Sequence, residues 1–315
     1  MPKEEARRLP RSLVSFLRDL AVAFLLVAIV FAALFAFART WPPMVVVESG
    51  SMQHSNTESF LGVVDTGDIV VVQTAPHRQD IATYVQGRAA GYSNYGDFGD
   101  VIVFQDPDGP AGRWIIHRAI VFLEWNDSVP GGRFNIPTLD SESLVRGVDW
   151  DSSTGSPYGL GSADSVTLMN VGFRGRDVEI RMERFFPQLN LTDCPASCQG
   201  YVTMGDNNAP THDVDLVFQG LILGRSRGEL PWFGLLKLTF AGPFAWGDVR
   251  APANSWSALT FSLILLVAGP IGLDVGLSLL ASRREKRKPT NPGEHEADGS
   301  PDDDEGSSTD ETSTK

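Results

Sequence analysis

The feature that most restricts this chain is the segment Leu20–Ala38, which contains no charged residue, Pro or Gly. As a helix it would span about 28 Å, close to the thickness of the hydrocarbon core of a bilayer. Residues 1–19 before it are basic and polar, whereas only Arg39 follows it closely. The positive-inside rule therefore predicts a cytoplasmic N-terminus at residues 1–19 and a transmembrane helix at residues 20–38.

A cleaved signal peptide is the main alternative for this segment. The apolar part of such a peptide is usually ~7–15 residues long, which is shorter than the run observed here. The sequence Arg39-Thr40-Trp41-Pro42-Pro43 that follows is also a poor cleavage site, because it lacks the small residues a signal peptide ends in. We therefore expect the helix to be retained as an anchor.

A second apolar segment covers residues 256–280 and predicts another transmembrane helix. Gly269, Pro270 and Asp274 interrupt it, but Gly and Pro are tolerated in spanning helices. The basic run Arg283–Lys288 follows at once, which places this end in the cytoplasm as well. The expected product is a multi-pass protein of the cell membrane. Its residues 42–250 lie outside, and residues 283–315 form a cytoplasmic tail, first basic, then acidic and disordered.

Residues 42–250 have the pattern of a mostly β domain. Short β-branched runs separated by Gly, Pro, Asp and Asn recur, and long amphipathic helical periodicity is absent. Two stretches look like insertions or loops: residues 76–99, and a second around 126–170 that is rich in Gly, Ser and Asp. A structureless loop of the second length is unusual, so that insertion is expected to carry small strands of its own. The predicted strand runs are Val45–Val47, Ile69–Val72, Val101–Phe104, Ile115–Ile120, Val178–Met182, Tyr201–Met204 and Leu216–Leu223.

The charge composition limits the partners and indicates the environment. The net charge is −13 and the pI is about 4.8, which argues against nucleic acid as a partner. Of the 26 basic residues only 5 are Lys, and an acidic, Lys-poor surface is typical of proteins kept soluble in high salt. The composition thus predicts a halophilic source.

Cysteine usage leaves two interpretations open. Cys194 and Cys198 would close a small disulfide loop outside the cell, or they are two unpaired structural cysteines. A zinc site would need two further ligands, and no His lies nearby in the sequence. No metal and no other cofactor is expected.

The stretch Val45–Met52 is the candidate centre of the chemistry. A β-branched run ends there in the turn Ser49-Gly50-Ser51-Met52, only a few residues after the first predicted span. Taken alone, this is a strand that ends in a small-residue turn. If the turn presents a nucleophile, Ser51 needs a base, and His or Lys are the usual choices.

The distribution of basic side chains points to His rather than Lys as that base. Lys237 is the only Lys between Lys3 and Lys286, so a Ser–Lys pair would have to use it. Among the external histidines, His117 ends an apolar strand and would be held rigidly, whereas His54 lies very close to Ser51 in the chain and His77 falls in a polar loop. A structural hydrogen-bonding role is the alternative for His117.

An Asp/Asn-rich turn supplies candidate carboxylates. The segment Thr203–Asp215 reads as a strand followed by a loop, and in isolation it is an ordinary hairpin. Its carboxylates could orient an imidazole, as in a Ser-His-Asp arrangement.

Five motifs taken in order resemble type I signal peptidase of the archaeal and endoplasmic-reticulum type. In that branch a His replaces the Lys base of the bacterial enzymes, in agreement with His117 and the shortage of external Lys. The segment Gly220–Gly234 also resembles the closing segment of the family. The segment between His117 and Tyr201 is longer than the family core leads us to expect. The motifs are Ser49-Gly50-Ser51-Met52, Gly67-Asp68-Ile69-Val70, Gly99-Asp100-Val101-Ile102-Val103-Phe104, Ile116-His117-Arg118 and Gly205-Asp206-Asn207-Asn208.

The resemblance implies a membrane-bound serine endopeptidase that removes signal peptides from secreted preproteins, cutting after small residues at the outer membrane surface. Ser51 would be the nucleophile and His117 the general base, with the Ser51 N–H and the Ser49 hydroxyl as oxyanion donors. The family's orienting Asp falls at the position of His212 here. We therefore assign that role to Asp213, one residue later, with Asp206 as a supporting or alternative carboxylate and Asp215 third.

The expected fold is a signal-peptidase-like β catalytic domain tethered by an N-terminal and a C-terminal transmembrane helix. Expected partners are signal peptides of secretory preproteins and the lipid bilayer, with the protein-translocation machinery as a further candidate. Two alternatives remain: a related serine peptidase that processes other membrane precursors, and a non-enzymatic β-rich receptor or scaffold in which Ser51 is a turn residue.

Overall fold

The computed structural model describes residues 11–107, 109–128, 130–139, 150–152, 164–194, 198–241 and 250–285. The chain divides into two compact units, residues 1–262 and 263–315. The first unit contains every described strand, and the described part of the second is the helix that continues to residue 285. The predicted disordered tail lies outside the described residues from position 286 onward.

Two described helices are long and apolar enough to cross a membrane. Helix α1 (Arg11–Ala38) begins before the predicted Leu20, because the apolar residues of its first turns extend the helical segment and neither Arg18 nor Asp19 breaks a helix. Helix α5 (Ser255–Glu285) contains Pro270 and likewise extends beyond the predicted segment at both ends. Most side chains of both candidate spans are exposed, and the buried ones, Ala38, Ser255 and Leu259, lie at or near the ends of the helices that join the β domain. A mostly β fold with an apolar helix in each terminal region is therefore confirmed.

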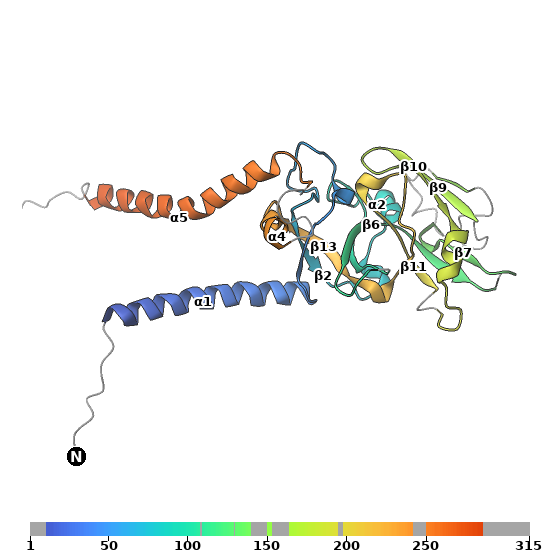
Figure 1. The fold of residues 1–315 in the computed structure, drawn as a ribbon, viewed down its shortest axis with the longest axis horizontal. Coiled ribbons are helices and arrows are strands. Elements are labelled where there is room, and N and C mark those ends of the chain that lie inside the picture. The colour runs from blue at the N-terminus through green and yellow to red at the C-terminus, as the bar shows by residue number, and fades with distance from the viewer. Residues whose placement is uncertain are drawn as a thin grey trace, which may run out of the picture. The chain divides into compact units, whose positions relative to one another are not determined.

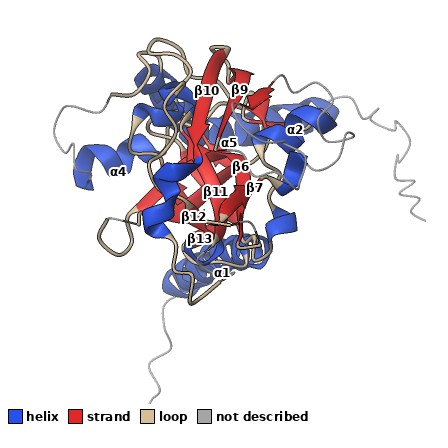
Figure 2. Cartoon of the chain, turned by 90° about the vertical axis from the view of Figure 1, so that its right-hand side faces the viewer, coloured by secondary structure: helices blue, strands red, loops and turns tan. Residues whose placement is uncertain are grey.

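A large antiparallel sheet forms the framework of the first unit (Figure 1). Its order is β1-β2-β13-β5-β6-β11-β12, with β7 also paired to β6, and Figure 2 shows β6, β11 and β12 running side by side. The strands are β1 (Met44–Val46), β2 (Ile69–Gln73), β5 (Val101–Gln105), β6 (Trp114–Asn126), β7 (Arg133–Asn135), β11 (Gln199–Met204), β12 (Val217–Phe218) and β13 (Ile222–Leu230).

The β-branched runs of the sequence lie in strands, except that Val47 follows the end of β1, Met182 begins a 3₁₀ helix, and one run is divided. The predicted strand Leu216–Leu223 is split by a 3₁₀ turn at Gln219–Leu221, so that β12 ends and β13 begins within it. The turn lets the two halves pair with different partners: β12 with β11, and β13 with β5 and β2. An apolar run alone gives no sign of such a break, because Gly220 is its only turn-forming residue.

Both predicted insertions contain regular structure. Residues 76–99 hold helix α2 (Tyr84–Ala90), a 3₁₀ turn at Arg78–Asp80 and the hairpin β3 (Ser93–Asn94)–β4 (Asp97–Phe98). Thr83 caps α2, because its hydroxyl accepts from Gln86 N and the Gln86 side chain accepts from Thr83 N. That helix was missed, as was α4 (Gly234–Ala241), since both are too short to show clear periodicity.

The second insertion carries strands of its own, as expected. The first is β7, which the 3₁₀ turn η3 (Pro137–Leu139) follows, and the others form a small antiparallel sheet of order β10-β9-β8 that extends past residue 170. The small sheet is formed by β8 (Trp150–Ser152), β9 (Ser165–Val171) and β10 (Arg176–Arg181). Residues 140–149 and 153–163 of this insertion lie outside the described residues.

The small sheet is fixed to the large one by a shared core. Val166, Leu168 and Ile180 of the small sheet belong to the same buried cluster as Ile120 of β6 and Val202 of β11. Each such side chain contributes about 1.5–3 kcal/mol when fully buried. The β9–β10 hairpin is thereby a fixed part of the domain.

The strand that leads to Ser51 is held by a second buried cluster. Val47 precedes the turn that carries Ser51, Met52 is the last residue of that turn, and both belong to a buried cluster with Val64 and Val70. Val47 N donates to Asp68 O at 2.9 Å, and Gly67 N donates to Val47 O at 3.0 Å. Gly67 has a φ of 97° and a Cβ there would lie 2.4 Å from Leu235, so only glycine fits this turn.

Asp68 joins three segments below the serine turn. Its side chain accepts from Trp232 N at 2.8 Å and from Asp65 N at 2.7 Å, and the residue is fully buried. Burial raises the pKa of Asp68 to about 7, with nearby Asp65 and Glu229 adding to the rise against the lowering effect of the two N–H donors. Burial likewise raises the pKa of Asp65 to about 6.

This raised pKa predicts a pH-dependent loss of stability. Between about pH 4 and pH 7 folded Asp68 keeps a proton that the unfolded chain releases, so its contribution to stability falls as the pH rises through that window. For Asp68→Asn, which cannot ionise, the free energy of unfolding should gain on wild type by on the order of 4 kcal/mol over this range. Denaturant titration of the detergent-solubilised full chain at several pH values measures the difference.

The exposed turn residue Asp127 provides the matched control. Asp127→Asn should run parallel to wild type at every pH. A constant difference between Asp68→Asn and wild type from pH 4 to pH 8 would contradict the assignment.

Candidate active site

Ser51 lies in a single 3₁₀ turn, Gly50–Met52, which residues 47–49 connect to β1. Met52 is buried and anchors the turn in the core, whereas Ser51 is half-buried. The turn Gly205–Asn208 packs against it so closely that a Cβ on Gly205 would lie 2.5 Å from Ser51 O. The serine backbone is thus confined from both sides.

His117 lies in β6, opposite Ile102 of β5, and its ring reaches Ser51. The distance from His117 Nε2 to Ser51 Oγ is 3.0 Å. The residue is buried, and Phe104 packs edge-on against the imidazole at 6.4 Å between ring centroids. A central strand and an aromatic neighbour therefore hold the ring in one orientation.

Asp213 contacts the other nitrogen of the same ring. His117 Nδ1 lies 2.6 Å from Asp213 Oδ2, and Thr203 Oγ1 donates to that oxygen at 2.5 Å. Asp213 N also donates to Thr203 O at 2.8 Å, which ties the loop to the end of β11. Thr203 is fully buried, and its role in orienting Asp213 was not predicted from the sequence.

The contacts of Asp213 set the direction of the hydrogen bonds at His117. A carboxylate only accepts, so the Nδ1–H of His117 must donate to it. The neutral ring then presents Nε2 as an acceptor to the Ser51 hydroxyl. Ser51, His117 and Asp213 form a connected chain in which the hydroxyl proton has a base to move to.

His212 and Asp213 are neighbours in the chain, but their side chains face different surroundings. His212 turns into the core, where it packs beside Phe185 and its Nδ1 lies 2.6 Å from Asp213 O. Burial lowers the pKa of His212, which favours a neutral ring that donates to this carbonyl. Position 212 therefore faces inward and position 213 faces His117.

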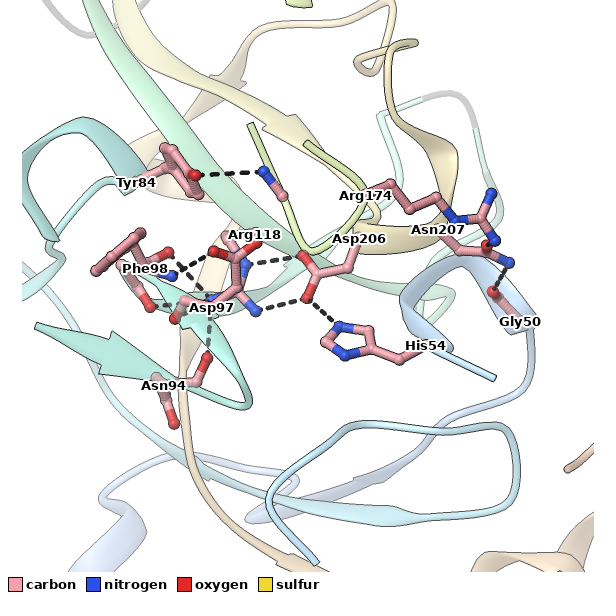
Figure 3. Close-up of polar contacts among 12 residues, drawn as sticks. Gly50, His54, Tyr84, Asn94, Asp97, Phe98, Arg118, Arg174, Asp206 and Asn207 are labelled. Carbon is pink, nitrogen blue, oxygen red and sulfur yellow. Dashed lines mark hydrogen bonds and ion pairs between the residues drawn. The ribbon is translucent and has the colours of Figure 1, made fainter. Parts of the chain in front are cut away.

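Asp206 lies in a separate, fully buried ion pair. Arg118 donates to it through Nε at 2.8 Å and through Nη2 at 2.6 Å (Figure 3). Burial alone would raise the pKa of Asp206, but the Arg118 guanidinium outweighs it and holds that pKa below its usual range. His54 Nε2 is 3.2 Å from Asp206 Oδ2. Asp206 therefore supports the site through Arg118 and His54, while Asp213 contacts His117.

Arg118 also binds the backbone around it. Its Nη1 donates to a ring of carbonyls in the β3–β4 hairpin and the turn after it, and the whole side chain is buried. These acceptors are the carbonyl oxygens of Asn94, Asp97, Phe98 and Gly99. The sequence motif included Arg118 but gave no sign that its charge is buried.

The remaining candidates occupy distinct positions. Ser49 Oγ lies 3.2 Å from Ser51 Oγ, so its hydroxyl can donate to an oxygen atom bound beside Ser51. Lys237 Nζ binds Glu48 Oε1 at 2.9 Å. Gln188 donates to Asp215 at 2.7 Å, and His77 begins the 3₁₀ turn Arg78–Asp80.

A cavity of about 850 Å³ opens beside Ser51 and His117. Two segments form most of its wall, residues 45–49 with Ser51, and residues 110–117, and Asn208 and Lys237 complete it. Among the described residues β1 is an edge strand, paired only with β2. The pairing of β6 with β11 covers Arg118–Glu124, so residues 114–117 of β6 have strand β5 on one side only.

The sequence also led to predictions about the two cysteines and about metal binding. Cys194 and Cys198 form a disulfide, which settles the two interpretations of that pair. No group of three or more His, Cys, Asp or Glu side chains within the described ranges is arranged to hold a metal ion.

No family model matches this sequence, and no curated protein matches it either. The assignment of a role to the site therefore depends on its geometry and on the motifs in the sequence.

The buried ion pair leads to a stability prediction. Arg118→Met should lower the free energy of unfolding by about 3–5 kcal/mol, because it leaves the Asp206 carboxylate buried without its cation. Adding Asp206→Asn removes that charge and should restore part of the loss. Denaturant unfolding followed by Trp fluorescence measures all three proteins.

Arg181, which pairs with Glu179 on the surface, supplies the control. Arg181→Met should unfold like wild type, because exposed pairs are screened by solvent. Equal stability of Arg118→Met and Arg181→Met would contradict a structural role for the buried pair.

Proposed function

We propose that this protein is a membrane-bound serine endopeptidase that removes signal peptides from secreted preproteins at the outer membrane surface. The observation that carries the proposal is the chain of contacts Ser51 Oγ to His117 Nε2 at 3.0 Å and His117 Nδ1 to Asp213 Oδ2 at 2.6 Å. A nucleophile within reach of a base that a third group orients is the arrangement of acyl-transfer catalysis.

The alternation of side chains along β6 supports the role of His117. His117 is directed to Ser51, while its neighbour Arg118 is directed to the buried Asp206. The imidazole is thus fixed by the strand below it and by Asp213 beside it. Orientation of this kind is what a general base needs before substrate arrives.

The proposed reaction moves one proton through His117 in each half: the Ser51 hydroxyl proton to the leaving amine, and then a proton of the attacking water to Ser51 Oγ. Ser51 Oγ attacks the scissile carbonyl carbon while His117 Nε2 takes the hydroxyl proton and Asp213 stabilises the resulting imidazolium. The C–N bond then breaks, and His117 gives the proton to the leaving amine. Water, activated by the same imidazole, hydrolyses the acyl-enzyme and restores the Ser51 hydroxyl.

The oxyanion that forms in each step needs donors near Ser51. The Ser51 N–H and the Ser49 hydroxyl are the proposed pair, since Ser49 Oγ is 3.2 Å from the nucleophile. Loss of one such donor typically costs about 10²–10³ in kcat. Ser49 is exposed and polar, so this contact is available to a bound substrate.

The cavity walls favour a peptide in extended form. The edge strand β1 and residues 114–117 of β6 offer backbone N–H and C=O groups to the cavity that contains Ser51. An extended chain can bind there as an added strand, with shallow apolar contacts from Val45 and Ile115. Signal peptides end in such a segment, with small residues before the cut.

The two apolar helices support a location at a membrane. Helix α1 ends at Ala38, whose carbonyl accepts from Thr74 N at 2.8 Å, directly after β2. Only a few residues separate α1 from the strand that leads to Ser51. The basic flank of each apolar segment is consistent with both termini in the cytoplasm and the β domain outside.

Substitution of the reacting residues tests the proposal. Ser51→Ala and His117→Ala should each reduce cleavage of a purified preprotein, with the full chain reconstituted in lipid vesicles, to the level of protein-free vesicles. Gel separation of precursor and mature protein measures the rate, and N-terminal sequencing of the product locates the cut.

Two matched variants should retain cleavage. Lys237→Met tests the alternative Ser–Lys pair directly, since Lys237 lies in the cavity wall but contacts Glu48, and Ser93→Ala removes an exposed hydroxyl on β3. Full processing by Ser51→Ala would rule the proposal out. Cleavage of other membrane precursors but not of signal peptides would favour the related peptidase.

A further inference from the structure

The turn of the β9–β10 hairpin lies against the residues that hold Ser51 in place. This turn, residues 172–175, belongs to the small sheet that begins within the second insertion, and it is distant from the serine turn in the chain. Two neighbouring side chains, Phe173 and Arg174, reach the serine turn by separate routes. Both side chains are exposed, so their positions are not explained by burial in the core.

The first route runs through His54. The ring of Phe173 stacks on the imidazole of His54, with 4.1 Å between centroids and 21° between planes. His54 follows Ser51 by three positions, and its Nε2 lies 3.2 Å from Asp206 Oδ2. The segment after the nucleophile is thus held between the aromatic ring of the hairpin and the buried carboxylate.

The second route runs through Asn207. Arg174 Nη2 donates to Asn207 Oδ1 at 2.5 Å, and Asn207 Nδ2 donates to Gly50 O at 2.9 Å (Figure 3). Asn207 therefore connects the hairpin to the carbonyl of the residue just before Ser51. The arginine fixes which way the Asn207 amide faces, because its guanidinium can only donate and so selects the oxygen.

The hairpin is itself fixed from behind. Gly172 N donates to Tyr84 Oη at 3.2 Å, and Arg88 Nη1 donates to Met169 O at 2.9 Å. Both partners belong to α2, which packs on the same core as the small sheet. A turn anchored in this way can resist displacement of whatever it contacts.

We propose that Phe173 and Arg174 are positioning residues that hold the Ser51 turn in its reactive geometry, Phe173 through His54 and Arg174 through Asn207. The inference rests on the proposed function, since it assigns the two residues to the same site. It gives the small sheet a role in catalysis, although neither side chain contacts Ser51, His117 or Asp213.

The physical basis is that the reaction rate depends steeply on the distance between the nucleophile and its base. A shift of about 1 Å between a nucleophile and its base can cost on the order of 10²-fold in rate. Gly50 and His54 flank Ser51 in the chain, so the two routes restrain the turn at both of its ends. Losing both restraints should reduce kcat more than it raises KM, because the cavity walls that bind an extended peptide remain.

The test uses the full-length double variant Phe173→Ala/Arg174→Ala in lipid vesicles. We expect kcat for preprotein cleavage to fall by about tenfold or more with KM changed by less than about threefold. Hydrogen exchange of the Ser51–Gln53 amides should be faster by about tenfold, while the amides of β5 exchange as in wild type. The exchange measurement does not depend on activity, so it tests the restraint even if the proposed function fails.

Two further variants separate positioning from general stability. Phe173→Tyr with Arg174→Lys keeps the stacked ring and a donor, and should recover most of kcat. Arg176→Ala removes an exposed side chain from the same hairpin and should match wild type in kcat and in exchange.

Three results would overturn the inference. The first is wild-type exchange of the Ser51–Gln53 amides in a folded double variant. The second is a uniform increase of exchange across the domain, which would indicate a merely structural role. The third is wild-type kcat in the double variant while Ser51→Ala is inactive, which would refute the positioning role and leave the proposed function intact.

Discussion

The buried ion pair between Arg118 and Asp206 is the interaction on which the site depends. Arg118 belongs to β6 and directly follows His117, while Asp206 directly follows Gly205, which packs on the backbone of Ser51. Their two charge-assisted hydrogen bonds therefore fix the end of β11 and the serine turn relative to the strand that carries His117. A pair removed so fully from water is costly unless its remaining groups are satisfied. The backbone carbonyls around Arg118 and the ring of His54 provide those partners.

This arrangement separates support from chemistry. Asp206 is engaged by Arg118, so the carboxylate beside the imidazole is Asp213, which Thr203 holds from the strand below. Asp206 sustains the framework, and Asp213 orients the imidazole of His117. Each of the two carboxylates thus has its own positively charged or hydrogen-bonding partner, Arg118 for Asp206 and His117 for Asp213.

The sequence allowed the β-rich fold, the apolar helices and the grouping of Ser51, His117 and Asp213 to be predicted. Strands and apolar helices could be predicted because β-branched runs and long uncharged segments are local patterns that the sequence shows directly. The roles of Phe173, Thr203 and Arg118 could not be predicted, because each depends on contacts between segments far apart in the chain. The break at Gln219–Leu221 depends on which strands pair, and the inward direction of His212 depends on its contacts with Phe185 and Asp213 O; sequence pattern alone determines neither.

The central claim is that Ser51 is a nucleophile activated by His117. Covalent labelling tests it most directly, with a peptide aldehyde that carries small residues before the aldehyde carbon as the probe. The full-length protein in lipid vesicles is incubated with the aldehyde. Native mass spectrometry then detects the adduct, and a crystal structure of the adduct identifies the modified residue. The account predicts a hemiacetal on Ser51 Oγ that is lost in His117→Ala, whereas an adduct on another residue, or equal labelling of His117→Ala, would contradict it.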